Sequence, residues 1–383
     1  MISFALVQAK KASYISPPNP AVGCVLVSPA GKVIAQGHTQ AVGGAHAEVM
    51  ALRDAAASGE STHEATAYVT LEPCSHYGRT PPCCNALIEA KVAKVVIALL
   101  DPNPLVAGKG VELLQKAGIE VEVLPVDHPQ AVAAKELMIG FFSRMVRKRP
   151  WVRLKIAASL DGKTALENGQ SKWITSSEAR DDGHAWRARA SAVLTGIGTV
   201  LADDPSLDVR AVPTQRQPHV VIVDSALQTP VTAKVFTIKN IAAKAINTPS
   251  RGIFIYTNTQ NMVTQAALEA MGATVIVLPQ SDASGKVDLH AMMQDLAKRE
   301  INELHVEAGS TLNGALISAG LVDEFLFYVA PKFLSSGRGM ADLPGLADVN
   351  LAAAFEFVSA DKVGEDLRIL GRITALNNGF GSF

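Results

Sequence analysis

His46-Ala47-Glu48, followed by Pro73-Cys74 and then by Cys83, is the most informative pattern in this chain of 383 residues. One imidazole and two thiolates can hold a zinc ion in three positions and leave the fourth for water. Zinc lowers the pKa of bound water to about 7, and a nearby glutamate can then move its protons. The pattern therefore predicts a zinc ion on His46, Cys74 and a second cysteine, with Glu48 as the catalytic proton carrier.

The order His-x-Glu, Pro-Cys, Cys is the signature of zinc-dependent hydrolytic base deaminases. The interval between the cysteines departs from that signature: eight residues, instead of two, separate Cys74 from Cys83. Cys83 and Cys84 are adjacent, so the spacing alone leaves open which of them binds. Each residue by itself could be structural, and only the joint arrangement favours a metal. Cys24 is expected in the core.

The surrounding residues predict that both halves of the pattern lie at helix starts, where the helix dipole favours thiolates. Apolar residues at helical spacing follow His46, and an apolar strand leads into Pro73-Cys74. The expected strands are 21–27, 32–37, 66–71, 94–100 and 119–124, and the expected helices are 46–57, 83–91, 108–117 and 129–145. Alternating strands and helices indicate an α/β fold, a sheet covered by helices.

The basic stretch Met145-Val-Arg-Lys-Arg-Pro150 is the best domain boundary. Past it, a strand over 151–157 begins the second half, which lacks a zinc-type cluster. Two later segments read as strand, glycine loop and helix, one through Gly196 and one through Gly309. Such loops bring backbone N–H groups and a helix N-terminus close to phosphate. Neither matches a full dinucleotide fingerprint, yet together they favour a phosphate-bearing ligand.

Composition limits the remaining possibilities. Hydrophobic residues make up 48% of the chain and charged residues 19%, which predicts packed cores rather than disorder. The formal net charge of −1 argues against nucleic acid as a partner. No apolar run reaches 18 residues, and the N-terminal stretch lacks a basic region before its apolar part, so we expect neither a membrane span nor a signal peptide. Free cysteines in a zinc pattern fit a reducing compartment, and we expect a cytoplasmic protein.

Three other interpretations compete with a bifunctional enzyme. The second half could be a non-catalytic nucleotide-binding domain, which NADPH oxidation would test. A nucleic-acid base deaminase is disfavoured by the near-neutral charge and by aromatic residues at only 5%. A structural zinc module is disfavoured because structural sites use four protein ligands, whereas this pattern offers three and a glutamate.

Longer strings point to one family. In the first half they are Pro18-Asn-Pro-Ala-Val-Gly-Cys24, His46-Ala-Glu48, Thr70-Leu-Glu-Pro-Cys-Ser-His-Tyr-Gly-Arg-Thr-Pro-Pro-Cys-Cys84 and Asp101-Pro-Asn-Pro104. In the second half they are Ala158-Ser-Leu-Asp-Gly162, Ser171-Lys-Trp-Ile-Thr175, Thr199-Val-Leu-Ala-Asp-Asp-Pro205 and Val306-Glu-Ala-Gly309. In this order they resemble the bacterial bifunctional riboflavin-biosynthesis deaminase/reductase family over nearly the whole chain, including the eight-residue interval between the cysteines.

The resemblance implies a cytidine-deaminase-like three-layer α/β/α domain over 1–146 and a dihydrofolate-reductase-like α/β domain over 150–375. The first would remove the 2-amino group of 2,5-diamino-6-(5-phosphoribosylamino)pyrimidin-4-one with one zinc ion. The second would use NADPH to reduce the ribosyl side chain of the product to ribityl. The partners implied are this phosphorylated pyrimidine and further copies of the chain, as a dimer or tetramer, without nucleic acid or membrane.

The resemblance also assigns residues by matching position. It implies His46, Cys74 and Cys83 as zinc ligands, Glu48 as the proton shuttle, and Asn19, His76, Arg79, Asp101 and Asn103 as deaminase substrate contacts. The NADPH contacts implied are Ala157, Trp173, Thr199, Asp203, Ser225, Gly309, Ser310, Thr311, Leu312, Asn313, Gly314 and Ala315. The reductase substrate contacts implied are Ser171, Arg187, Leu207, Arg210 and Glu307, with Lys155 near the sugar. Permanently charged, bidentate arginines suit a ribose phosphate.

Overall fold

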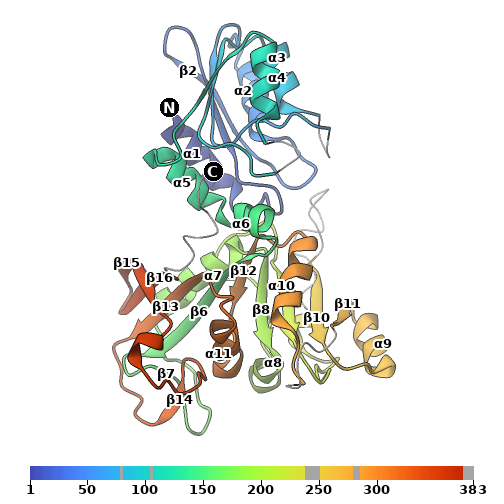
Figure 1. The fold of residues 1–383 in the computed structure, drawn as a ribbon, viewed down its shortest axis with the longest axis vertical. Helices are drawn as coiled ribbons and strands as arrows, with labels where there is room; N and C mark the ends of the chain where they lie inside the picture. The colour runs from blue at the N-terminus through green and yellow to red at the C-terminus, as the bar shows by residue number, and fades with distance from the viewer. Residues whose placement is uncertain (78–80, 104–106, 238–250, 279–284, 374–383) are drawn as a thin grey trace. The chain divides into compact units, whose positions relative to one another are not determined.

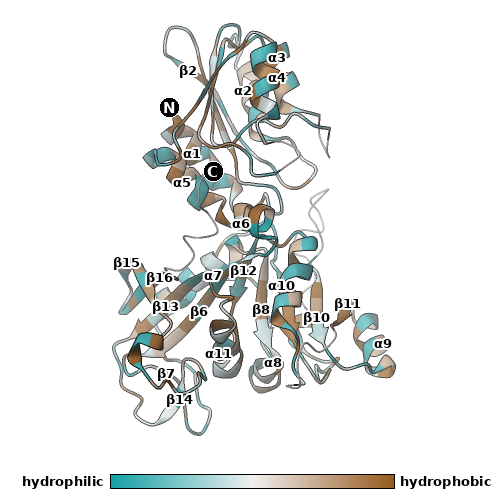
Figure 2. Cartoon of the chain, viewed as in Figure 1, coloured by the Kyte–Doolittle hydropathy of each residue, from teal (hydrophilic) through white to brown (hydrophobic). Residues whose placement is uncertain are grey.

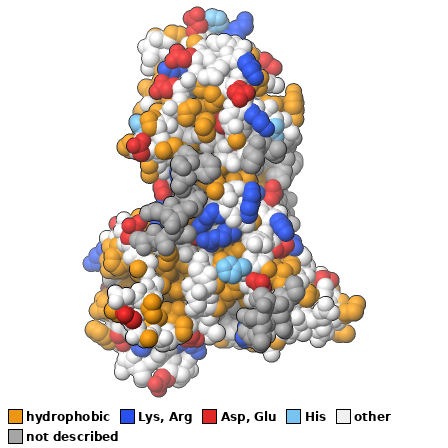
Figure 3. All heavy atoms as spheres, viewed as in Figure 1, with side chains coloured by type: hydrophobic (Ala, Val, Ile, Leu, Met, Phe, Trp, Pro, Cys, Tyr) orange, Lys and Arg blue, Asp and Glu red, His pale blue; other side chains and the backbone are white. Residues whose placement is uncertain are grey.

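The computed structural model describes residues 1–77, 81–103, 107–237, 251–278 and 285–373. These residues form two compact units, unit 1 from Met1 to Lys148 and unit 2 from Arg149 onward. Both charge signs are visible on each unit on the face drawn in Figure 3, in keeping with the near-zero net charge. Among the helices in these ranges, none is long and apolar enough to cross a bilayer.

Unit 1 is built on a five-stranded sheet with the order β2-β1-β3-β4-β5 (Figure 1). Strand β1 pairs antiparallel with β2 and β3, whereas β3, β4 and β5 run parallel. The strands are β1 Gly23–Val27, β2 Val33–His38, β3 Thr66–Val69, β4 Lys94–Ile97 and β5 Glu120–Val123. The helices are α1 Ile2–Ala12, α2 Ala47–Ala57, α3 Cys83–Glu89, α4 Lys109–Lys116, α5 Pro129–Leu137 and α6 Ile139–Arg147.

Helices cover both faces of this sheet, with α1 and α5 on one side and α2, α3 and α4 on the other (Figure 1). This arrangement is the predicted three-layer α/β/α architecture. Close packing of α2 depends on small residues. A Cβ atom at Gly37 of β2 would lie 2.4 Å from both the Ala47 carbonyl oxygen and the Ala51 nitrogen. The glycine therefore lets the start of α2, which carries the His46-Ala47-Glu48 pattern, lie directly on the sheet.

The strands and helices predicted between residues 21 and 124 are present within three residues of their expected bounds. The single long helix predicted over 129–145 was wrong. The chain leaves helical geometry at Met138, with φ −111° and ψ 18°, and two helices meet there. Hydrophobic residues continue through the junction, so the apolar pattern gives no sign of the break.

Unit 2 contains a nine-stranded sheet with the order β11-β10-β9-β8-β12-β6-β13-β16-β15. The first seven strands in this order are parallel, and β16 and β15 continue the sheet antiparallel. Figure 2 shows hydrophobic residues along β8, β10 and β11. The predicted α/β class of the second half is confirmed.

The large sheet of unit 2 contains β6 Trp151–Ser159, β8 Ala192–Gly196, β9 His219–Val223, β10 Ile253–Thr257, β11 Ala273–Val277, β12 Glu303–Val306, β13 Glu324–Ala330, β15 Phe355–Val363 and β16 Asp366–Ile373. A small separate sheet pairs β7 Lys163–Leu166 with β14 Gly337–Gly339. The helices are α7 Ser177–Arg189, α8 Ile197–Asp203, α9 Met262–Ala270, α10 Leu289–Lys298 and α11 Ser310–Ser318, with short 3₁₀ turns at Lys234–Phe236 and Val349–Leu351. Both predicted strand–glycine–helix segments are present, as β8–α8 and β12–α11.

Candidate active sites of the two units

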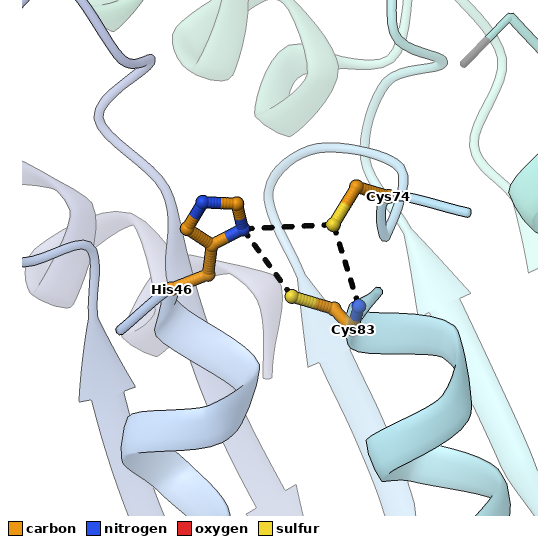
Figure 4. A group of neighbouring side chains, drawn as sticks. All are labelled: His46, Cys74 and Cys83. Carbon is orange, nitrogen blue, oxygen red and sulfur yellow. Dashed lines mark hydrogen bonds between the residues drawn. The ribbon is translucent and has the colours of Figure 1, made fainter. Parts of the chain in front are cut away.

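Three soft donor atoms converge in unit 1 (Figure 4). The Nδ1 atom of His46 lies 3.6 Å from the Cys74 Sγ atom and 3.3 Å from the Cys83 Sγ atom. The donor atoms of all three residues lie within 4.8 Å of one another. One imidazole and two thiols at this spacing fit the ligand set of zinc, and three protein ligands leave one of its four positions for water.

Secondary structure brings these side chains together. His46 is the extended N-cap residue of α2, Cys83 is the first residue of α3, and Cys74 follows β3. The Cys83 N–H donates to the Cys74 Sγ atom over 3.3 Å. Since both helix starts aim backbone dipoles toward the group, negative charge on the sulfurs is stabilised there.

Glu48 lies in the first turn of α2 and is only 3% exposed. Burial, and then the negative charge of Cys74, raise the pKa of the Glu48 carboxyl to about 7, although His46 opposes the shift. A carboxyl group with a pKa near neutrality is suited to accept and return a proton.

The cysteines differ in their surroundings. Hydrogen bonds from Cys83 and His46 lower the pKa of the Cys74 thiol against the effect of burial, and the pKa of Cys83 is raised because it donates to Cys74. Cys84 is directed elsewhere: its thiol donates to the carbonyl oxygens of Pro73, over 3.2 Å, and Gly110, over 3.6 Å. The geometry thus groups Cys83, rather than Cys84, with His46. Cys24 is fully buried in the core, as expected.

The residues predicted to contact the deaminase substrate lie in three segments of unit 1. Asn19 precedes β1, His76 follows Cys74, and Asp101 and Asn103 follow β4. His76 has a buried Nδ1 atom without a hydrogen-bond partner in the described part of the chain. Burial raises the pKa of Asp101 to about 7, and the Asn103 N–H donates to its Oδ1 atom over 2.8 Å. Arg79 lies outside the described residues.

Sequence reasoning missed Glu72, a carboxylate only 3% exposed, two residues before Cys74. Its two oxygens accept four backbone N–H groups, from Asp101, Gly108, Gly110 and Val111. An acidic residue directly between Leu71 and Pro73, at the end of a strand pattern, is the one sequence signal that could have drawn attention to it.

In unit 2 the two glycine loops lie side by side. A Cβ atom on Gly309 would lie 3.9 Å from the Thr199 hydroxyl, and one on Gly196 would lie 3.3 Å from a methyl group of Leu312. The N-caps of α8 and α11 are Gly196 and Gly309, and neither helix start is capped by a side chain. Free N–H groups at two adjoining helix starts fit the phosphates of a dinucleotide.

The other residues predicted to contact the cofactor differ in exposure and in hydrogen bonding. Trp173 is 67% exposed, with the Arg180 guanidinium over its ring, whereas the Ser225 hydroxyl accepts the Val287 N–H. Several residues of α11 already contact another segment of the protein. Thr311 and Asn313 hold residues 340–342 by hydrogen bonds, and the backbone of Asp342 packs against Gly314. Ala157 lies within β6, two residues before its end, and Ser310 is the first residue of α11. Asp203 and Ala315 are exposed on helices.

Arg187 and Glu307 form a bidentate ion pair. Arg187 Nε donates to Glu307 Oε1 over 2.7 Å, and its Nη2 donates to Oε2 over 2.8 Å. Arg187 Nη1 also donates to the Asp208 carbonyl oxygen over 2.5 Å. Burial by itself would raise the pKa of Glu307, but Arg187, His305 and Lys155 hold it well below its usual range. The sequence named both partners but did not predict that they pair.

Basic side chains gather around this pair. The pKa of Lys155 is lowered by burial, and Arg210, with a side chain 63% exposed, binds Asp208 over 2.7 Å. Leu207 is buried next to Asp208, and Ser171 is half-buried before α7. His305 was also missed. Its side chain is fully buried, and its Nε2 atom lies 3.5 Å from Glu307 Oε1.

The sequence matches two family descriptions, one in each unit. Residues 1–99 match the cytidine and deoxycytidylate deaminase zinc-binding region. Residues 150–369 match the RibD C-terminal domain. The deaminase half is therefore of the zinc-binding kind.

Curated relatives are similar over nearly the full chain. The riboflavin biosynthesis protein RibD of Escherichia coli (strain K12) is 43% identical over 95% of this chain and 96% of that protein. The protein of the same name from Aquifex aeolicus (strain VF5) is 40% identical over 96% of each chain.

Solved structures are also similar to nearly the full chain. Acinetobacter baumannii RibD is 39% identical, with a TM-score of 0.83 over 97% of this chain and 98% of that one. A diaminohydroxyphosphoribosylaminopyrimidine deaminase/5-amino-6-(5-phosphoribosylamino)uracil reductase from Thermotoga maritima is 32% identical, with a TM-score of 0.80 over 97% of each. The chain therefore belongs to the RibD family of bifunctional riboflavin-biosynthesis enzymes, with a hydrolytic deaminase in the first half and a reductase in the second.

Proposed function

We propose that the chain deaminates 2,5-diamino-6-(5-phosphoribosylamino)pyrimidin-4-one and then reduces the ribosyl side chain of the product to ribityl, with NADPH as hydride donor. The convergence of His46, Cys74 and Cys83 beside the buried Glu48 is the observation that carries the proposal. The Thermotoga maritima relative is a diaminohydroxyphosphoribosylaminopyrimidine deaminase and 5-amino-6-(5-phosphoribosylamino)uracil reductase by name, which supports both halves of the proposal. The domains proposed for them are residues 1–146 and 150–375.

In the first reaction His46, Cys74 and Cys83 would hold one zinc ion. Bound zinc supplies a water with a pKa near 7 as the nucleophile. Glu48 would accept a proton from the attacking water and would deliver a proton to the departing amine. The raised pKa of Glu48 supports both steps, because one carboxyl group must be deprotonated first and protonated later. Asn19, His76, Arg79, Asp101 and Asn103 would orient the pyrimidine.

In the second reaction the adjoining starts of α8 and α11 would bind NADPH. The residues proposed for this task are Ala157, Trp173, Thr199, Asp203, Ser225 and Gly309 to Ala315. The bidentate pair limits how Glu307 can bind the substrate. Because Arg187 already binds both of its oxygens, Glu307 can interact with the substrate only by accepting further hydrogen bonds from N–H or O–H groups. The exposed guanidinium of Arg210 is available to the ribose phosphate, and Ser171 and Leu207 complete the proposed substrate contacts.

Incubation of the purified protein with the diaminopyrimidinone phosphate, with and without NADPH, tests the proposal. Mass analysis should find ammonia and the uracil product without NADPH, and the ribityl product only when NADPH is present. Deamination without any NADPH oxidation would leave the second half as a non-catalytic nucleotide-binding domain. The dimer or tetramer and the cytoplasmic location stay predictions, which sedimentation and fractionation would test.

A further inference from the structure

The Glu72 carboxylate joins three parts of unit 1 that are distant in sequence. Oε2 accepts the N–H groups of Asp101, over 3.1 Å, and Gly108, over 3.0 Å. Oε1 accepts those of Gly110, over 2.9 Å, and Val111, over 3.3 Å. The carboxylate thus binds the segment after β4 and the first turn of α4, while its own backbone continues directly to Cys74.

These contacts are enclosed and leave little room for adjustment. A Cβ atom on Gly110 would lie 2.2 Å from the Pro73 carbonyl oxygen. The buried Cys84 thiol donates to the carbonyl oxygens of Pro73 and Gly110. The connection between Glu72 and Cys74 is therefore packed against α3 and α4 at once, and a shift of α4 would be transmitted to the residue before Cys74.

Glu72 itself has no access to substrate, because it is 3% exposed and each oxygen already accepts two N–H groups. A carboxylate has about four acceptor positions on its two oxygens, so the four N–H groups fill its capacity to accept hydrogen bonds. What it does control is the backbone of Asp101, and through Asp101 Oδ1 the backbone of Asn103.

We propose that Glu72 is a positioning residue for deamination: its carboxylate fixes Asp101 and Asn103 relative to Cys74. The inference rests on the proposed function, in which Asp101 and Asn103 contact the pyrimidine and Cys74 binds zinc. It assigns substrate binding in part to a residue that the substrate does not touch.

The test is Glu72→Gln in the full-length protein, assayed for ammonia release from the diaminopyrimidinone phosphate. The amide keeps the size but turns N–H groups toward backbone N–H donors. The KM should rise about tenfold or more, the scale of one hydrogen bond to a charged group. The kcat should stay within about threefold, because zinc and Glu48 are untouched. Zinc content and reduction of the deaminated substrate should equal those of the wild type.

The matched control is Leu26→Ala, in β1 of the same unit and fully buried. It should weaken unit 1 without moving the KM, because a merely structural defect lowers the fraction of active protein and hence the apparent kcat. Glu72→Asp keeps the charge and should give an intermediate KM, which decides the question if Glu72→Gln does not fold.

An unchanged KM in Glu72→Gln, or in Glu72→Asp if only that variant folds, would overturn the positioning role. Loss of zinc in proportion to activity would overturn it too, because Glu72 would then act on Cys74 alone. These results are distinct from failure of the proposed function, which would show as a wild-type protein that releases no ammonia from this substrate.

Discussion

Two adjacent cysteines at the start of α3 have opposite surroundings. Cys83 faces His46 and Cys74, whereas Cys84 donates its proton to two carbonyl oxygens. Burial raises the pKa of Cys84, and the hydrogen bond to Cys74 raises that of Cys83, so the direction of each thiol, and not its pKa, separates the two.

We therefore expect Cys83→Ser and Cys74→Ser to lose most bound zinc together with deamination, and Cys84→Ser to keep both. Serine at position 84 can still donate to the carbonyl oxygens of Pro73 and Gly110. Metal analysis of the three purified variants checks this. If zinc is lost from Cys84→Ser but kept in Cys83→Ser, then Cys84 and not Cys83 binds the metal.

Glu48→Gln should keep zinc but lower deamination by about 10²–10⁴-fold, the usual contribution of a general acid–base group. The amide has the same size but cannot accept the proton of water. The rate of ammonia release at saturating substrate is the measurement, and NADPH oxidation on the deaminated substrate is the control within the same chain. Near-normal ammonia release would remove Glu48 from the reaction.

At the scale of elements, β6, β12 and β13 are tied together by a buried cation. Arg153 of β6 donates to Glu303 of β12 and to Glu324 of β13, over 2.9 Å each. Its guanidinium lies 4.3 Å from the ring centroid of Trp186 on α7. Burial alone would raise the pKa of both glutamates, but neighbouring arginines lower it, so both carboxylates are charged at neutral pH.

Arg153→Met should cost about 3–5 kcal/mol of stability at pH 7, because it leaves two buried carboxylates without their shared partner. All three tryptophans lie in unit 2, so urea denaturation followed by tryptophan fluorescence reports this unit. The matched control is Lys234→Met, which removes an exposed ion pair with Asp204 and should cost about 0–1 kcal/mol.

The cost of Arg153→Met should also depend on pH. Because the folded-state pKa values of Glu303 and Glu324 are lowered, their stabilisation is present above the unfolded glutamate pKa of about 4.3 and is lost as the pH falls through the folded values. The difference between wild type and variant should therefore shrink below about pH 4. An equal difference at pH 7 and pH 3.5 would contradict the assignment.

What the sequence could predict follows from the distance between interacting residues. His46 and Cys74, the proposed zinc ligands, lie where local patterns place a helix start and a strand end, so their spacing in the sequence could predict that they belong to one site. The roles of Glu72 and Arg153 could not be predicted in this way, because the partners of Glu72 are 29 to 39 residues away and those of Arg153 are 150 to 171 residues away. The helix break at Met138 was hidden for a different reason, an apolar pattern that continues across it.

At the scale of the whole molecule, the zinc group and the Arg187–Glu307 pair each lie within one of the two units. We expect a cut between Lys148 and Arg149 to give a first fragment that deaminates without NADPH and a second that reduces only the deaminated product. Separate assays of the purified fragments check this, with the uncut chain as the reference. A folded first fragment that needs NADPH for deamination would contradict it.

The order of strands in unit 2 has a consequence for synthesis on the ribosome. Strand β6 is made first but lies between β12 and β13, and Arg153 precedes Glu303 by 150 residues. At about 5–20 residues per second, the nascent β6 waits about 8–30 s for its neighbours. During that time Arg153 and Lys155 interrupt its apolar run with charge, which opposes pairing with other unfinished chains. We therefore expect the arginine that later joins three strands of the sheet to oppose aggregation before the sheet exists.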